Sequence, residues 1–179
     1  MTENTQSFGL DEGTKQFCID RLNDIIEVTN SLGYDTQLSE LGDGLPTMFI
    51  GVQKNYKNED TIATLTFLPL EIRNDAYLLL QYSILINLEV PEERKEEMEL
   101  LIKIINERFL MGTLVLYDNE ISLKYCMYVN VDEELDQVST IRTLDILTIE
   151  ADDILKKADL LLENKSSLEE LAQENTFLD

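Results

Sequence analysis

The sequence contains no histidine and no tryptophan. The absence of histidine removes the commonest general base, the commonest metal ligand and every histidine-assisted serine or cysteine nucleophile. The patterns GxxxxGK[ST], GxGxxG and GxSxG do not occur either, so a phosphate-binding loop or a nucleophile elbow has no support. Without tryptophan, a sugar-binding cleft is disfavoured. We therefore predict a protein that is not an enzyme, with no catalytic, cofactor-binding or metal-binding residues.

Cysteine is also scarce, since the chain has only 2 cysteines. Cys18 falls in a predicted helix and Cys126 in a predicted strand, and there is no CxxC motif. This usage argues against a disulfide framework and favours a reducing compartment. Residues 1–4 lack the positive start and apolar run of a signal peptide, and no apolar run approaches bilayer length. We expect a cytoplasmic protein that does not contact membranes.

Basic residues are few: Lys and Arg number 14 against 36 Asp and Glu, which gives a formal net charge of −22. The acidic excess is spread over both halves of the chain, so no acidic tail accounts for it. A negative field of this size repels phosphate backbones and anionic membranes. It disfavours nucleic-acid binding and favours partners that are basic.

Clusters of carboxylates are the remaining material for catalysis or metal binding. Residues 132–136 and the pair Asp152 and Asp153 carry oxygen ligands of the kind that Ca²⁺ and Mg²⁺ prefer. Neither cluster has an EF-hand pattern, and we interpret both as solvated acidic surfaces. An enzyme that works with paired carboxylates stays open as a weaker alternative, which requires an enclosed cleft.

The 179 residues and 44% hydrophobic content predict one α+β domain with a real core. Asp11 is a candidate N-cap for a first helix that ends at Gly33. Short connections then join four runs of strand character, which predicts an antiparallel meander. These runs cover residues 34–41, 47–52, 61–68 and 76–88, with a turn at 42–44. The fourth run is almost continuously apolar, so we expect a central strand covered on both faces.

The second half of the chain predicts a helix, a hairpin and a long helix. Pro91 is placed to begin the first of these helices, whose apolar stripe is formed by Met98, Leu101, Ile102, Ile105 and Phe109. Asp118 and Asn119 tolerate positive φ and predict a two-residue turn between strands at 112–117 and 120–129. A long helix is expected over 137–163, with a strand over 141–149 as the alternative.

The predicted order is α-ββββ-α-ββ-α, with a short helix at 168–173 whose start carries the capping box of Ser167 and Glu170. The domain is expected over 11–163, between a flexible N-terminus at 1–10 and a C-terminal segment at 164–179. Some apolar residues fall opposite the predicted core faces of the helices and are candidate subunit or partner contacts. They are Leu100, Ile104, Ile146, Ile149 and Leu160.

The segment around the hairpin carries a family resemblance. Residues 104–109, with the sequence IINERF, lead through Gly112 into the hairpin and then into the long helix. In this order of elements the chain resembles the YbjN-like family of bacterial proteins, whose fold is similar to that of type III secretion chaperones. The resemblance implies a small acidic non-enzymatic protein, often a homodimer, that binds a partner polypeptide or acts in regulation.

The sequence therefore favours two classes of function. The first is an intracellular protein-binding, chaperone-like or regulatory module that acts through apolar helix faces and an acidic surface. The alternative is an acidic inhibitor, either a nucleic-acid mimic or an immunity protein against a basic partner, whose binding would weaken as salt screens the attraction.

Overall fold

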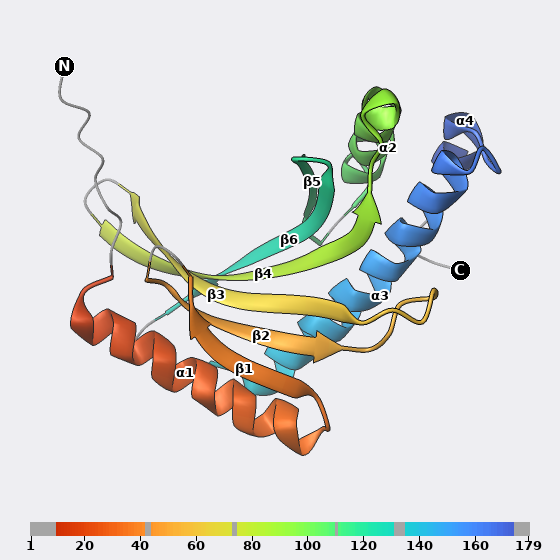
Figure 1. Ribbon diagram of the computed structural model, residues 1–179. Coiled ribbons are helices and arrows are strands. Elements are labelled where there is room, and N and C mark those ends of the chain that lie inside the picture. The colour runs from red at the N-terminus through yellow and green to blue at the C-terminus, as the bar shows by residue number, and fades with distance from the viewer. Residues whose placement is uncertain (1–9, 42–43, 73–74, 110, 131–134, 174–179) are drawn as a thin grey trace.

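The computed structural model describes residues 10–41, 44–72, 75–109, 111–130 and 135–173 (Figure 1). The first half consists of one helix and four strands: α1 (Glu12–Ser31), β1 (Asp35–Glu40), β2 (Pro46–Val52), β3 (Thr61–Ile72) and β4 (Asp75–Glu89). The second half contains the 3-10 turn η1 (Glu92–Arg94), α2 (Lys95–Asn106), β5 (Thr113–Tyr117), β6 (Glu120–Val129), α3 (Gln137–Leu162) and α4 (Leu168–Gln173). This α+β order of helices and strands agrees with the sequence-based prediction.

The predicted helix boundaries follow from capping chemistry that the structure contains. Asp11 accepts a hydrogen bond of 3.0 Å from the backbone N–H of Thr14 and starts α1, and Gly33 follows its end with a φ of 88°. Ser167 and Glu170 form the reciprocal bonds of a capping box at α4. Residues 141–149 are helical, so the strand alternative for this segment is wrong.

One helix start differs from the expectation. Pro91 has extended backbone angles (φ −59°, ψ 141°) and precedes η1, and α2 begins only at Lys95. Arg94, the last residue of η1 and the N-cap of α2, has φ −109° and ψ 2°, outside the α-helical range. Its guanidinium points to the C-terminal end of α3, where it donates to the carbonyl oxygens of Leu161 (2.8 Å) and Leu162 (3.1 Å).

The six strands form one open antiparallel sheet in the order β1-β2-β3-β4-β6-β5. The β5–β6 turn has positive φ at Asp118 (46°) and Asn119 (68°), as the hairpin prediction required. The sheet curves strongly, so that β5 and α2 rise at one end of it (Figure 1). No helix in the described ranges combines the length and the apolar character that crossing a membrane demands.

The helices bury their apolar residues against one face of this sheet. α1 contacts β1 and β2, α3 contacts β4, and α2 contacts β5, α3 and α4. The side chains of Leu22 in α1, Met98 in α2 and Leu147 in α3 belong to the same core as Leu80 and Ile84 of β4. The fold therefore has a helical layer on one side of the sheet only.

This arrangement corrects the expectation for β4. The strand is central, between β3 and β6, as predicted. Its exposure alternates, however: Leu80, Tyr82 and Ile84 are buried, whereas Leu85 on the other face is 45% exposed. β4 is thus covered on one face, and its apolar residues on the second face need another explanation.

The β5 edge of the sheet is closed by a side chain of α2. The amide of Asn106 donates to the carbonyl oxygen of Leu114 (3.0 Å) and accepts from its backbone N–H (2.8 Å). These two bonds reproduce those that a further strand would make, and they remove a place where another chain would pair. Asn106 thereby fixes α2 to the sheet and protects its edge.

Candidate functional site

The face of the sheet opposite the helices is the largest structural feature that the core does not use. We call the central part of this face the open face, and define it by the side chains that the strand register places there in β2, β3, β4 and β6, between the edge strands β1 and β5. In β3 and β6 these are the even-numbered residues 62–70 and 122–128. In β4 they are the odd-numbered residues 77–85, and in β2 they are Thr47, Phe49 and Gly51.

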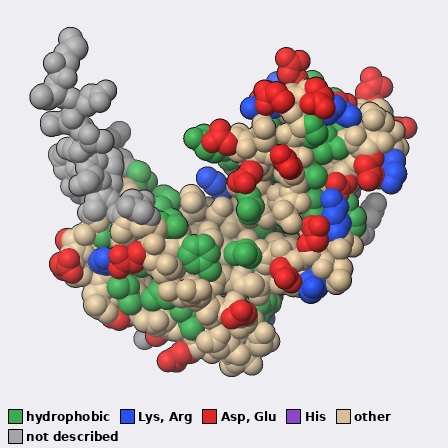
Figure 2. Space-filling model, viewed as in Figure 1, with side chains coloured by type: hydrophobic (Ala, Val, Ile, Leu, Met, Phe, Trp, Pro, Cys, Tyr) green, Lys and Arg blue, Asp and Glu red, His purple; other side chains and the backbone are tan. Residues whose placement is uncertain are grey.

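The open face differs in charge from the rest of the chain. None of these central residues is acidic and only Lys124 is basic, although 36 of the 179 residues of the chain are acidic. The acidic residues on this side of the sheet lie at its margins: Asp35 of β1 beside Gly51, and Glu89 and Glu120 at the ends of β4 and β6. It also carries large exposed apolar side chains, including Ile62 (53%), Leu85 (45%) and Tyr128 (57%). Figure 2 shows hydrophobic side chains across the middle of the molecule and acidic side chains gathered over α2 and α3. An exposed apolar patch with a polar rim is typical of a binding surface.

Apart from Lys124, the polar groups of the open face are neutral, and several form hydrogen bonds with one another. The hydroxyls of Thr47 and Thr66 share a hydrogen bond of 3.0 Å and are both buried. Tyr77 and Tyr128 make an edge contact, with ring centroids 6.0 Å apart. The surface is therefore formed by paired neutral groups and aliphatic side chains, which a partner can cover without leaving charges buried.

Acidic residues appear at one end of the open face, where β4 contains an irregularity. The register shifts between Ile86 and Glu89, and Glu89 then lies directly opposite Glu120 of β6. Like charges at opposite positions of two strands destabilise a sheet. Asp118 of the β5–β6 turn joins them around an open pocket of about 330 Å³, whose lining includes Leu85, Asn87 and Asn119.

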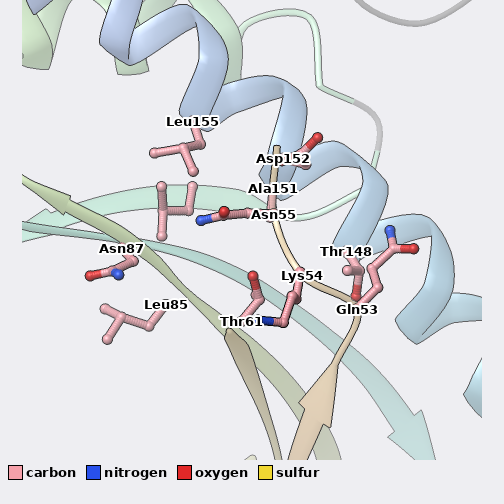
Figure 3. A pocket seen from close by; sticks show the side chains of 11 residues that line it. Gln53, Lys54, Asn55, Thr61, Leu85, Asn87, Thr148, Ala151, Asp152 and Leu155 are labelled. Carbon is pink, nitrogen blue, oxygen red and sulfur yellow. The ribbon is translucent and has the colours of Figure 1, made fainter. Parts of the chain in front are cut away.

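A second, much smaller cavity lies between α3, the β2–β3 connection and the end of β4 (Figure 3). It measures about 10 Å³, and its labelled side chains include Asn55, Thr61, Thr148 and Asp152. Space of this size holds one water molecule. It is too small for the cleft that a carboxylate-based enzyme requires.

The β2–β3 connection beside this cavity is fastened to α3. Tyr56 donates its backbone N–H to Asp152 (2.6 Å) and its hydroxyl to Asp159, and Lys57 forms an ion pair with Asp159. Partial burial and the Asp159 hydrogen bond raise the pKa of Tyr56 above its ordinary value. Asp152 and Asp159 of the acidic surface of α3 therefore have a structural role, because they hold the β2–β3 connection against the helix.

The structure also accounts for the carboxylate pair that the sequence placed on α3. Asp152 forms an ion pair with Lys156 (2.8 Å) and Asp153 with Lys157. Within the described ranges, no group of three or more acidic or cysteine side chains is arranged to hold a metal ion. Residues 132–134 of the other predicted cluster lie outside the described residues, and Asp136 caps α3 by accepting from the backbone N–H of Ser139 (3.1 Å).

The buried Cys18 and the half-buried Glu150 line neither of the two pockets described above. Burial raises the pKa of the Cys18 thiol to about 12, so this side chain is a neutral core residue. Burial, followed by the charge of Asp153, raises the pKa of Glu150 to about 7, while Lys157 opposes the shift. Glu150 does not line the cavity of Figure 3. Its position on α3 therefore identifies no substrate site.

The predicted contact residues lie on two helices rather than on the open face. Leu100 (52%), Ile146 (43%) and Ile149 (60%) are exposed, and Ile104 and Leu160 are half-buried. Leu160 packs against the core. Ile146 and Leu160 are separated by about 21 Å along α3 at 1.5 Å per residue, so the set does not form one compact patch.

Sequence reasoning missed the open face and the pocket at its end. The available signal was the alternation of neutral polar and apolar residues in β3, β4 and β6, which becomes a shared surface only when the register is known. No protein-family model and no curated protein matches this chain. The function of the protein must therefore be inferred from its own residues and their arrangement.

Proposed function

We propose that this protein is a non-enzymatic polypeptide-binding module, chaperone-like or regulatory in its action, whose binding surface is the open face. The observation that carries the proposal is the absence of acidic side chains from the open face in a chain of net charge −22. A surface that only kept the protein soluble would carry charge like the rest of the molecule. Exposed aliphatic and tyrosine side chains on a rigid sheet suit apolar segments of a partner.

The resemblance to the YbjN-like family and to type III secretion chaperones supports the same class. It adds a proposal of self-association, in which Leu100, Ile104, Ile146, Ile149 and Leu160 contact a second copy. The helical surface and the open face would then serve different partners. The exposed, unpaired Cys126 on the open face suits a reducing compartment such as the cytoplasm.

The open face favours this function over that of an acidic inhibitor. A nucleic-acid mimic needs carboxylates arranged on the surface that its target covers. The broadest uncovered surface of the described chain has none at its centre. The acidic residues lie instead at the margin of the open face and on the helices.

The test replaces exposed apolar side chains and measures binding of an unfolded polypeptide. We expect the double substitution Ile62→Asp and Tyr128→Asp to abolish binding of fluorescently labelled, reduced and carboxymethylated α-lactalbumin, measured by anisotropy. The control, Leu32→Asp with Val138→Asp, changes side chains of similar exposure (60% and 55%) outside the open face. Equal binding by both variants, or no binding by the wild type, would refute the proposed function.

A further inference from the structure

The pocket at the end of the open face has features that the general binding surface does not explain. Its lining combines the exposed aliphatic side chain of Leu85 with the carboxylates of Glu89, Asp118 and Glu120. A volume of about 330 Å³ falls at the lower end of the range for ligand pockets, which begins at roughly 300 Å³. The pocket is continuous with the open face, because Leu85 belongs to both.

The pocket exists because of the irregularity in β4. Between Ile86 and Glu89 the strand has two more residues than β6 has between Ile121 and Glu120, so the ladder is interrupted there. Such bulges redirect side chains and are frequent beside functional sites. Here the bulge places Glu89 opposite Glu120, although either residue could be neutral without any loss to the core, because both are exposed.

The three carboxylates have no ion-pair partner among the residues that the structure describes. No Lys or Arg of the described chain lines the pocket. Asn119 also belongs to the lining, but its amide oxygen is itself fully buried, without a hydrogen-bond partner in the described chain, and is not open to a ligand. The described carboxylates are not grouped as metal ligands. A charged organic group with several N–H donors satisfies these conditions better than a metal ion does.

We infer that this pocket binds a Lys or Arg side chain of the polypeptide that occupies the open face. The aliphatic part of the basic side chain would lie on Leu85, as long basic side chains do on apolar surfaces, with its charged end among the carboxylates. Apolar neighbours of that basic residue would cover Ile62 and the centre of the open face. This inference rests on the proposed function and adds the chemistry of the partner: an apolar segment with a basic residue at one end.

A second copy of this chain is a less suitable occupant than a basic partner. The open face of a copy would bring a further net charge of −22 to the same pocket, and it offers only Lys124 as a cation. A foreign segment that is basic gains from the field of the whole molecule during approach. Charge complementarity therefore favours a basic partner polypeptide over a second copy of this chain as the occupant of the pocket.

The experiment selects ligands from a display library of random dodecapeptides on the wild-type protein. The most enriched peptide is then labelled, each basic residue in it is replaced in turn by glutamine, and binding is measured by anisotropy. The protein variants are Glu89→Gln with Glu120→Gln, and a control of equal charge, Glu27→Gln with Glu99→Gln on α1 and α2. Removing the like-charge pair should not unfold the sheet, which circular dichroism would verify.

We expect one basic residue of the peptide whose replacement weakens binding at least fivefold for the wild type and for the control. For Glu89→Gln with Glu120→Gln, the same replacement should change binding less than twofold, because the partner charge is gone. An equal loss with all three proteins would overturn the inference, and so would a peptide whose binding depends on no single basic residue. In those cases a loss of peptide binding in Ile62→Asp with Tyr128→Asp would still uphold the proposed function. Failure to enrich any peptide would overturn both.

Discussion

Arg94 connects the two halves of the helical layer, and its replacement by methionine is the most informative test of the fold. The guanidinium donates to the carbonyl oxygens of Leu161 and Leu162 and to the side-chain oxygen of Asn164 at 3.2 Å, and it forms an ion pair with Glu97 at 2.6 Å. The two carbonyls belong to the last turn of α3, where no later turn of the helix supplies N–H donors; that of Leu161 also accepts from the backbone N–H of Asn164 (3.1 Å). Arg94 therefore caps α3 from the beginning of α2.

The expected loss follows from these contacts. Hydrogen bonds to charged groups contribute about 1.5 to 3 kcal/mol each when buried. The side chain of Arg94 is 20% exposed, and water can replace part of what is lost, so the exposed pair with Glu97 adds little. The positive charge of Arg94 also interacts favourably with the negative C-terminal end of the α3 dipole. From the hydrogen bonds and this interaction together, we expect Arg94→Met to lower the free energy of unfolding by about 3 kcal/mol.

The assay is urea unfolding followed by far-ultraviolet circular dichroism, with the slope of the transition compared between proteins. Arg142→Met is the matched control, since Arg142 is exposed and lies on the surface of α3. Arg94→Lys keeps the charge but lacks the planar guanidinium with its several N–H donors, so its free energy of unfolding should lie between those of the wild type and Arg94→Met. A loss below about 1 kcal/mol, or one equal to that of Arg142→Met, would refute the reasoning.

Three further predictions concern a half-buried carboxyl, a glycine and the helical surface. Because the native pKa of Glu150 is about 7, above its ordinary 4.5, ionisation costs the native state, and stability falls as pH rises from 4.5 to 7. Glu150→Gln should therefore stabilise the protein by roughly 1 kcal/mol above pH 7 and by less below pH 4.5, measured by urea unfolding; a pH-independent effect would contradict this. Gly112→Ala should destabilise by about 2 kcal/mol, because φ is 107° and the new Cβ would lie 2.7 Å from the carbonyl oxygen of Lys124, whereas Gly51→Ala should not. Leu100→Asp with Ile104→Asp should lower the solution mass measured by light scattering without unfolding the protein; a wild type that is already monomeric and a mass that does not change would reject the helical contact.

The order and bounds of the elements could be predicted because their signals are local. Asp11, the pair Asp118 and Asn119, and the box of Ser167 and Glu170 each satisfy backbone groups within a few residues. Such chemistry is visible in a single stretch of sequence. The helices and strands of the described chain accordingly begin and end close to the expected residues.

The open face could not be predicted, because it depends on which strand faces which. Leu79 and Leu85 alternate with buried aliphatic residues of β4, so the strand resembled one covered on both sides. The absence of acidic residues appears only when the register combines four strands into one surface. The bulge that brings Glu89 opposite Glu120 has no local signal, and the contacts of Arg94 with α3 join residues 67 and 68 positions apart.

The closed β5 edge limits how copies of this protein can assemble through their sheets. A filament that grows by strand addition needs two receptive edges on every subunit, one to accept and one to offer. The amide of Asn106 already occupies the pairing positions of Leu114, which obstructs strand addition to β5 at this residue. Sheet-to-sheet pairing of two molecules is therefore expected at their β1 edges, and such a pair would leave only the obstructed β5 edges for further growth. A protein that offers an apolar surface to other chains is in this way kept from polymerising with itself.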